Sequence, residues 1–418
     1  MTRSDFLKSS LLLAASAGSG ASLADACLPA KSPVKKPAPP RNRRPYSGID
    51  WSKALQINTT SHGHCINQDF LDKYIKHRFG FITISNYYPS APVVPGKEFR
   101  DHHYRVNHDW PVMVNGKRTD GPFDWNEIIR PYAGKLEEKY RRQLPFKLGG
   151  KMFPKWPEGM LEAPNAEHHG FLDENGKSCG NLHMCAPGSA FKSGTFDARY
   201  FFKTHTGGYH HGSGEYWGTA IDRMIEGMIY EDGGGITINH PTWTHLDREF
   251  LLKLLDHDPR VLGIEVLEAG TNSENYWDWA LSTGRQCFGV FVPDWSIDNE
   301  KTFGVNVLVV PERTVHACLK AYRLGNFYGA HRGYGELAFT SITFDGNVLK
   351  VKTDKKARFE VKTARGIRME TTGTEVKWVK SPDPKPRRQD WGTDIFVRVK
   401  AYALDGSGEV LYTQPIML

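Results

Sequence analysis

The sequence predicts an α/β fold with a barrel-like core and a small all-β region at its C-terminal end. Short apolar, β-rich runs alternate with helix-like stretches, beginning with ALQINTT, FLDKYIKHR and FGFITISNYY. This strand, helix, strand order favours a parallel core. Further strand-like and helix-like runs follow at GGITINHP, LDREFLLKLLDHD, GIEVLEAG, NYWDWALSTG, QCFGVFVPD and FGVNVLVV. Several such units indicate a barrel, whose chemistry collects at the C-terminal ends of its strands.

Two regions interrupt this alternation. Residues 88–164 are rich in Pro, Trp and charge, and are typical of an insertion after the second strand that would roof the site. From about Gly335 onward the pattern has period two, with turn pairs at Asp345-Gly346 and Asp405-Gly406. We therefore expect a barrel over residues 48–335 and a β-sandwich-like domain over residues 336–418.

The N-terminal segment predicts export. Residues 1–26 combine a short charged start, a modest apolar stretch and a small-x-small cleavage site at Ala24-Asp25-Ala26. Ser4 stands where a twin-arginine signal has its second arginine, so the export route stays open. Residues 27–47 form a Pro-, Lys- and Arg-rich linker, and Cys27 is an alternative site for a lipid anchor. We expect a periplasmic or extracellular protein, membrane-tethered only if Cys27 is lipidated.

The composition is typical of a globular protein and indicates no particular partner. The 418 residues are 39% hydrophobic, which is enough for a large core. The net charge is +7, but much of the excess lies in the linker, and no nucleic-acid-binding signature accompanies it. We therefore expect no nucleic acid partner, and no later apolar stretch is long enough to span a membrane. An oxidising compartment would permit disulfides among Cys65, Cys179, Cys185, Cys287 and Cys318.

Histidines and acids lie at or near several of the predicted strands. His62 and His64 follow the first run, and residues i and i+2 of a strand point the same way, so both can chelate one ion. Imidazole and carboxylate ligands from several strands are typical of a multinuclear metal site. The other candidates are Glu167, His183, His240 and Asp294.

Each candidate ligand also has a purely structural interpretation. His62 and His64 could be solvated loop residues, and His183 a satisfied core histidine. His240 could begin a loop before a proline, and Asp294 could cap a helix. His168 and His169 compete with Glu167 for its role, and Cys65 fits a buried thiol better than a ligand.

Taken in order, these motifs resemble the polymerase and histidinol phosphatase (PHP) superfamily of metal-dependent phosphoesterases, over roughly Ile49 to Gly333. HGH resembles the family's first motif, AEHHG puts Glu167 where the family has a bridging glutamate, and NLHMC, GITINHPTW and VPDW supply His183, His240 and Asp294. GIEVLEAG and LGNFYGAHRG are further similarities. The resemblance implies a distorted (β/α)7-type barrel, exported and followed by a β domain.

The resemblance also implies two metal ions, of Zn, Mn or Fe. One would be held by His62, His64, Glu167 and Asp294, and the second by Glu167, His183 and His240. Members with three metals have an Asp and a His where this chain has residues 84–88, and a further His where Ser296 stands. A complete third site is therefore not expected, although Asn86 could still serve as a neutral ligand.

Two ions so placed predict hydrolysis of a phosphomonoester or phosphodiester by a metal-bridging hydroxide. The substrate would be a small-molecule or sugar-linked phosphoester. His205, in a Gly-rich loop, is the candidate acid or extra ligand, and Arg332 the candidate phosphate clamp, with Arg100, Arg105, Lys151 and Lys155 as further cations. The alternatives are a metal-dependent amide or ester hydrolase, and a non-catalytic surface protein that binds carbohydrate.

Overall fold

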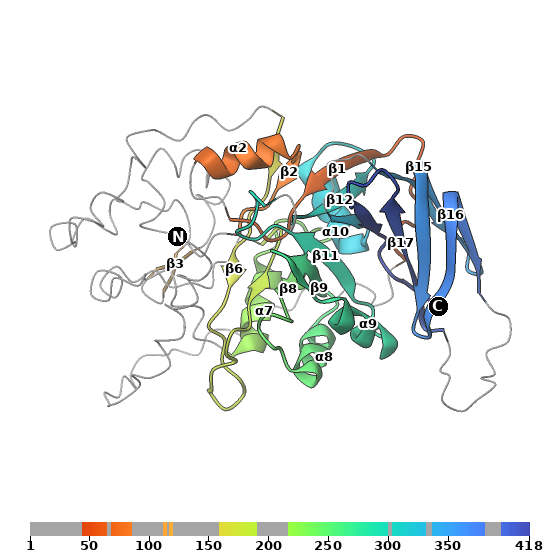
Figure 1. Cartoon of the computed structure of the whole chain (residues 1–418). Coiled ribbons are helices and arrows are strands. Elements are labelled where there is room, and N and C mark those ends of the chain that lie inside the picture. The colour runs from red at the N-terminus through yellow and green to blue at the C-terminus, as the bar shows by residue number, and fades with distance from the viewer. Residues whose placement is uncertain are drawn as a thin grey trace, which may run out of the picture. The chain divides into compact units, whose positions relative to one another are not determined.

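The computed structural model describes residues 44–64, 68–85, 112–114, 117–119, 159–189, 216–299, 303–331, 337–380 and 394–418. All of them belong to one compact unit, Lys35–Leu418. They form a mixed α/β fold in which curled sheet predominates over helix (Figure 1). The export signal, Cys27 and most of the predicted insertion lie outside the described residues.

A nine-stranded sheet joins the first predicted strand to the C-terminal region. Strand β1 (Leu55–Thr59) pairs antiparallel with β12 (Gly304–Val310), which pairs antiparallel with β13 (Phe327–His331). The sheet continues through β18 (Val410–Tyr412), β17 (Phe396–Ala403), β15 (Val348–Thr363) and β14 (Phe339–Phe344), with β16 (Gly366–Val379) on β15 and β19 (Ile416–Met417) on β17. The described residues of the C-terminal region thus contain strands and no helix, and they share this sheet with strands of the predicted barrel. The domain boundaries themselves stay a prediction.

A six-stranded sheet holds the centre of the chain. Its order is β10 (Thr271–Asn272), β9 (Val261–Glu268), β8 (Ile236–Ile238), β7 (Met184–Cys185) and β6 (Glu167–His168), with β11 (Phe288–Val292) on the other side of β9. Strands β8, β9 and β11 run parallel, whereas β6, β7 and β8 run antiparallel. The core is thus mixed and not parallel throughout. Between β6 and β7 the chain turns tightly at Asp173–Gly176, which leaves no crossover helix to make them parallel.

Short pairs of strands complete the described sheets. Strand β2 (Phe81–Ile82) runs parallel to β5 (Leu161–Glu162), and β3 (Val112–Val114) pairs antiparallel with β4 (Lys117–Thr119). The predicted strand FGFITISNYY is thus a strand over two residues only. Beyond β2, the backbone forms hydrogen bonds with the segments around Gly63 and Glu167 instead.

Helices form at the stretches whose sequence pattern most strongly predicted a helix. Helix α8 (Arg248–His257) begins at Asp247, whose side chain accepts from the Phe250 N–H at 2.8 Å, and it buries leucines at helical spacing. Helices α2 (Gln68–Lys76) and α9 (Glu274–Ser282) also match predicted stretches. Sequence patterns did not predict α7 (Trp217–Glu226) or α10 (Val315–Leu324).

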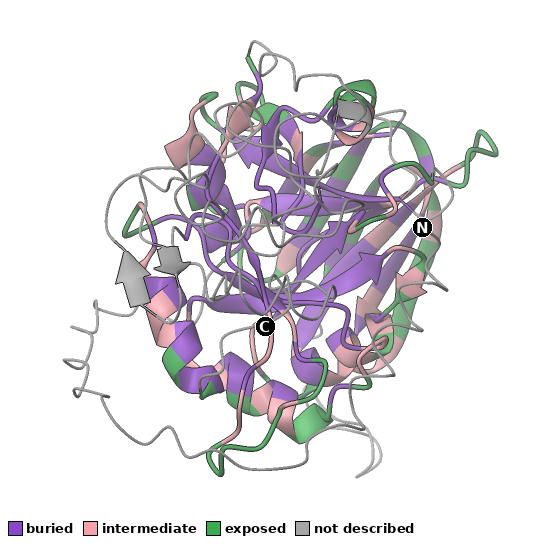
Figure 2. Cartoon of the chain, turned by 90° about the vertical axis from the view of Figure 1, so that its left-hand side faces the viewer, coloured by how far each residue is buried: buried purple, intermediate pink, exposed green. Residues whose placement is uncertain are grey.

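Helices α7, α8 and α9 pack against strands β8 and β9 (Figure 1). Each of these helices buries one face, and the rest of its surface is partly or fully exposed. Figure 2 colours the whole chain by burial. Ile264 and Val266 of β9 share this core with Leu251 and Leu254 of α8. Since side chains alternate along a strand, Glu265 between them points to the opposite face, away from the helices.

A buried ion network joins helix α9 to the C-terminal strands. The guanidinium of Arg398 in β17 donates to Asp278 at 2.8 Å and to Glu274 at 3.0 Å, and lies 4.6 Å from the centre of the Trp277 ring. The Arg398 side chain is 1% exposed. This network ties two segments more than 100 residues apart in sequence.

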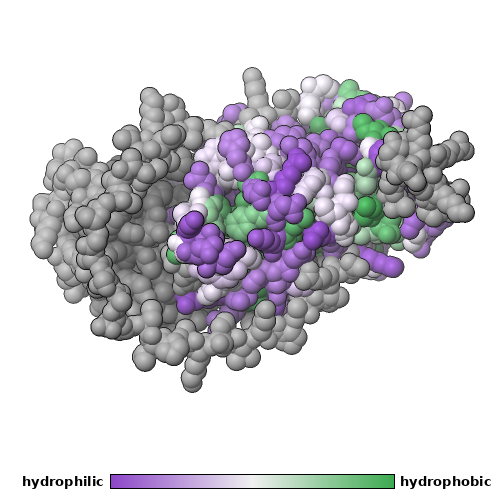
Figure 3. Space-filling view, turned by 90° about the horizontal axis from the view of Figure 1, so that it is seen from below, coloured by the Kyte–Doolittle hydropathy of each residue, from purple (hydrophilic) through white to green (hydrophobic). Residues whose placement is uncertain are grey.

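The predicted turn pairs close hairpins. Asp345 accepts from the N–H groups of Asn347 and Val348, and Gly346 has φ 102°, a conformation that favours glycine. On one face, polar side chains cover most of the described surface (Figure 3). In the part of the chain that the structure describes, no helix has the length and apolarity that crossing a membrane requires. Four of the six cysteines, Cys179, Cys185, Cys287 and Cys318, are described, and all four are free thiols.

Candidate metal centre

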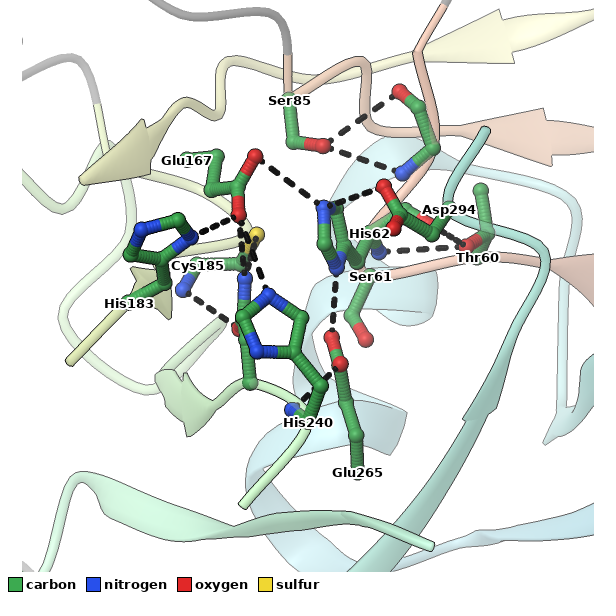
Figure 4. Close-up of polar contacts among 12 residues, drawn as sticks. Thr60, Ser61, His62, Ser85, Glu167, His183, Cys185, His240, Glu265 and Asp294 are labelled. Carbon is green, nitrogen blue, oxygen red and sulfur yellow. Dashed lines mark hydrogen bonds and ion pairs between the residues drawn. The ribbon is translucent and has the colours of Figure 1, made fainter. Parts of the chain in front are cut away.

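The structure brings the six predicted ligands together at neighbouring ends of strands. Figure 4 labels all of them except His64. His62 and His64 follow β1, His240 follows β8 and Asp294 follows β11, as expected for the C-terminal ends of strands. Glu167 instead begins β6, and His183 precedes β7. Because β7 is antiparallel to β8, its start lies beside the end of β8.

Backbone hydrogen bonds connect these strand ends in a ring. The His64 N–H donates to the Asp294 carbonyl at 3.4 Å, and the Asp294 N–H donates to the His62 carbonyl at 3.3 Å. On the other side, the Ser85 N–H donates to Gly63, and the Glu167 N–H donates to Ser85 at 2.8 Å. The pairings of β6, β7, β8, β9 and β11 complete the ring. Pairing therefore persists through the HGH motif and aims both histidines inward.

The first group of ligand atoms is closely spaced. His62 Nε2 lies 3.3 Å from His64 Nε2, 3.3 Å from Glu167 Oε2 and 3.0 Å from Asp294 Oδ1. His64 Nε2 lies 3.2 Å from the same Glu167 oxygen and 3.1 Å from the same Asp294 oxygen. Atoms bound at about 2.1 Å to a tetrahedral ion lie about 3.4 Å apart. The spacing of this group thus fits a ligand shell for a metal such as zinc.

The second group uses the other oxygen of Glu167. Oε1 lies 2.7 Å from His183 Nδ1 and 3.4 Å from His240 Nε2. Each oxygen of one buried carboxylate therefore faces a separate set of imidazoles. The grouping matches the two ligand sets that the sequence resemblance implies.

Two oxygens of the first group lack hydrogen bonds. Glu167 Oε2 and Asp294 Oδ1 are buried, and neither finds a well-oriented donor among the described residues, although both lie close to ring nitrogens. Buried carboxylate oxygens without donors are costly. A cation between them would remove this cost, so the donor set fits a metal ion.

Two of the ligands have unusual backbone conformations. His240 has φ 32° and Asp294 has φ 49°, values in the left-handed region that residues with a Cβ rarely adopt. Such conformations persist where surrounding contacts impose them, and they cluster at functional sites. Both occur at the residue where a strand ends and its ligand turns inward.

The electrostatics of the metal-free cluster favour charged pairs. Burial alone lowers the pKa of His62, but nearby acids, chiefly Asp294, outweigh it and raise that pKa well above its usual value. Burial likewise lowers the pKa of His64, but the adjacent carboxylates of Asp294 and Glu167 outweigh it and raise that pKa overall. Burial raises the pKa of Glu167, yet His62 and His183 hold it well below its usual range. The metal-free cluster thus favours the charged forms of His62, His64 and Glu167.

Two acids at the site were not predicted as site residues. Glu265 lies 2.8 Å from His62 Nδ1 and accepts from the His240 N–H at 2.8 Å. Burial, followed by the charge of Asp294, raises the pKa of Glu268 well above its usual value. Both stand in GIEVLEAG, where a charged residue in an otherwise apolar run was the signal available.

Two buried amides hold the segments that carry the ligands. Asn165 donates to the carbonyls of Ser61 and Thr83, and accepts from the Ala166 and Ala186 N–H groups. It therefore connects the backbones near His62, Glu167 and His183. Asn239 accepts from the Cys185 N–H and donates to its sulfur at 3.2 Å.

Tryptophans line the cluster. The Trp295 ring stacks on His64 at 4.0 Å between centroids with an interplanar angle of 13°, and it remains 37% exposed. Trp243 meets His240 edge-on at 4.9 Å. Asp294 and His183 keep 14% and 15% of their side chains exposed, so the cluster is reachable on their side within the described residues.

Several other predicted site residues lie outside the described residues. These are His205, Arg332, Cys65 and Asn86, together with the candidate cations of the insertion. Of the competitors for Glu167, His169 lies 5.6 Å from His183 between ring centroids, but neither His168 nor His169 belongs to a ligand group. Ser296 is described and likewise belongs to no such group.

Comparison with known proteins finds a distant structural similarity. No family model matches the chain, and no curated protein matches it. The chain is similar to a crystal structure of a two-domain protein from Bacteroides vulgatus, described as containing a predicted PHP-like metal-dependent phosphoesterase. That alignment covers 91% of this chain and all of the other, with 12% identity and a TM-score of 0.37. Values at this level do not assign the chain to a family.

Proposed function

We propose that this protein is a metal-dependent phosphoesterase with a dinuclear centre. The observation that carries the proposal is the carboxylate of Glu167, whose two oxygens face two separate sets of histidines. His62, His64 and Asp294 would hold one ion with it, and His183 and His240 the other. Zn, Mn and Fe all accept such ligands.

When bound, the two ions would supply an activated water and positive charge for the attacking and leaving oxygens of a phosphoester. The chain's own part is to fix these ligands and to present the substrate. The half-exposed Trp295 offers an apolar surface beside His64 for an organic or sugar leaving group. We propose His205 as an acid or an extra ligand, and Arg332 as a phosphate clamp.

The ring of strand ends supports a distorted (β/α)7-type barrel as the underlying fold. Residues 1–26 support export, and we propose a periplasmic or extracellular location on that ground. Phosphoesters suit the paired carboxylate and imidazole ligands best. Amide and acyl ester substrates are the comparison that a substrate panel must include.

Elemental analysis of the mature chain, purified without added metal or chelator, tests the metal centre. We expect two transition-metal ions per chain in the wild type and fewer in His240→Ala, because that variant loses a ligand of the second group. His257→Ala is the matched control, since His257 pairs with Asp222 away from the cluster. Absence of metal in the wild type, even after reconstitution, would contradict the proposal.

A substrate panel tests the reaction. We expect the metal-loaded protein to hydrolyse p-nitrophenyl phosphate or bis(p-nitrophenyl) phosphate, and to leave p-nitrophenyl acetate and p-nitroanilides nearly untouched. Glu167→Gln should abolish that hydrolysis. A preference for the acetate or anilide would replace the phosphoesterase by an acyl hydrolase, and inactivity on all substrates with metal bound would favour a binding protein.

A further inference from the structure

Glu265 contacts one histidine of each ligand group (Figure 4). It stands in the middle of β9 and is 1% exposed. One of its oxygens lies 2.8 Å from His62 Nδ1, and the other accepts from the His240 N–H at 2.8 Å. The two histidines follow β1 and β8, which do not pair with each other. One carboxylate thus fixes a member of each ligand group.

The contact with His62 determines which ring nitrogen can bind an ion. A carboxylate accepts hydrogen bonds, so it favours a proton on the Nδ1 that faces it. In the neutral ring, which is the form that binds a metal, Nε2 of His62 then keeps its lone pair, and this nitrogen faces His64, Glu167 and Asp294. Glu265 therefore selects the tautomer that the first ligand group requires.

The contact with His240 acts on the backbone. His240 has the left-handed φ of 32°, and its N–H points to Glu265 Oε2. That hydrogen bond helps to impose the conformation that turns the ring toward Glu167 Oε1. The same carboxylate therefore also sets the position of a ligand in the second group.

Glu265 is close enough to His62 and His240 to form a third possible ligand group with them. Such an ion would need the lone pair of His62 Nδ1, while Nε2 already faces the first group. A neutral imidazole has only one nitrogen lone pair to give. Both oxygens of Glu265 are also engaged by N–H donors, so its geometry is that of a support and not of a ligand.

We propose that Glu265 is a positioning residue that holds the His62 tautomer and the His240 backbone for metal binding by both groups. This inference rests on the proposed metal centre. Partners of this kind, which orient ligands without touching the ion, typically change metal affinity by about 10- to 100-fold when they are removed.

The variant Glu265→Gln separates this role from packing. Glutamine keeps the shape of glutamate but replaces one acceptor by an NH₂ donor, while both positions face N–H groups. If its oxygen stays on the His240 N–H, its NH₂ group forces His62 to carry its proton on Nε2. In that tautomer, the hydrogen on Nε2 points toward the first ligand group, so this nitrogen cannot bind an ion there.

The experiment measures zinc and cobalt affinity by chelator competition in the wild type, Glu265→Gln and Glu360→Gln. Glu360 is the matched control, because it is also a buried glutamate in a strand but contacts Tyr402 of the C-terminal sheet. We expect affinity to fall about 10- to 100-fold in Glu265→Gln and to stay unchanged in Glu360→Gln. The cobalt absorption spectrum should also change in Glu265→Gln alone. Circular dichroism of the metal-free proteins confirms that each is folded.

A second measurement needs no substitution at Glu265. In zinc-loaded wild type with ¹⁵N-labelled histidine, we expect His62 to carry a proton on Nδ1, with His62→Gln identifying its signals. An unprotonated Nδ1, or wild-type affinity in Glu265→Gln, would overturn the role of Glu265 while leaving the metal centre intact. Failure of the wild type to bind any ion would overturn the metal centre itself, and the role of Glu265 with it.

Discussion

Two regions of this protein bury several charged groups, and they do so in opposite ways. Around Arg398, a guanidinium donates directly to the carboxylates of Asp278 and Glu274, so cation and acids compensate each other. At the candidate metal centre, the acids face imidazoles, which are cations only when protonated, and two carboxylate oxygens lack a well-oriented donor among the described residues. The first region already contains its cations, whereas the second fits an added cation.

Glu167→Gln should have the largest effect on the candidate metal centre. It weakens the one group that serves both ligand sets, because an amide oxygen is a poorer ligand and its NH₂ group repels imidazole N–H. Removal of a residue that only supports a ligand lowers activity by up to about 100-fold. We expect hydrolytic activity to fall further than this in Glu167→Gln. Activity and metal content measured together would test this, with Glu360→Gln as the control. Retention of both ions would contradict the bridging role.

Metal binding should release protons. In the metal-free protein the pKa values of His62 and His64 lie above the usual value, because their acidic neighbours outweigh burial. Both rings therefore keep their protons to higher pH than a free imidazole does, and an ion must displace those protons, so affinity should rise as the pH rises. Calorimetry in buffers of different protonation enthalpy measures the release. Binding without proton release, or with pH-independent affinity, would contradict this electrostatic account.

Arg398→Met should affect stability and leave the metal centre unchanged. It removes the buried cation that Asp278 and Glu274 share, and removing one partner of a buried pair costs about 3–5 kcal/mol. Lys362 still donates to Asp278 at 2.6 Å and Lys400 to Glu274 at 2.7 Å, which limits that cost. We expect the lower end of this range, because these acids keep 21% and 15% of their side chains exposed. Urea unfolding gives the free energy, and Lys352→Met, at an exposed pair with Glu375, should cost about 1 kcal/mol or less. Loss of metal in Arg398→Met would show that the two regions are coupled.

The smallest effect concerns acid pH. Burial raises the pKa of Glu274, but Arg398 and Lys400 outweigh it and lower the value to about 2. A lowered folded-state pKa stabilises the fold above the unfolded value, and this contribution disappears as the pH falls toward 2. Glu274→Gln should therefore differ from wild type in unfolding free energy at pH 6, and the difference should shrink toward pH 2. A constant difference would exclude the ion pair as its source.

The sequence could predict the candidate ligands that the structure brings together because each stands in a short local pattern. HGH, NHP and VPD place His62, His240 and Asp294 just after apolar strands, and strand periodicity then determines their direction. The same reasoning predicted α8 and the Asp345-Gly346 turn, which depend on neighbouring residues. The grouping of the six ligands into two sets came from the family resemblance.

Features that depend on distant contacts were not predictable in this way. The antiparallel pairing of β7 with β8 depends on how the chain turns between Glu167 and His183, not on the strand residues themselves. Glu265 looked like a lone acid in an apolar strand, and its role needs His62, 203 positions away. Arg398 likewise meets Asp278 across 120 positions.

Anomalous diffraction from crystals of the metal-loaded wild type, recorded at the absorption edge of the bound metal, is the most direct test. Two peaks are expected, one among His62, His64 and Asp294, the other between His183 and His240, with Glu167 between the peaks. A single peak, or peaks away from Glu167, would contradict the bridged dinuclear centre.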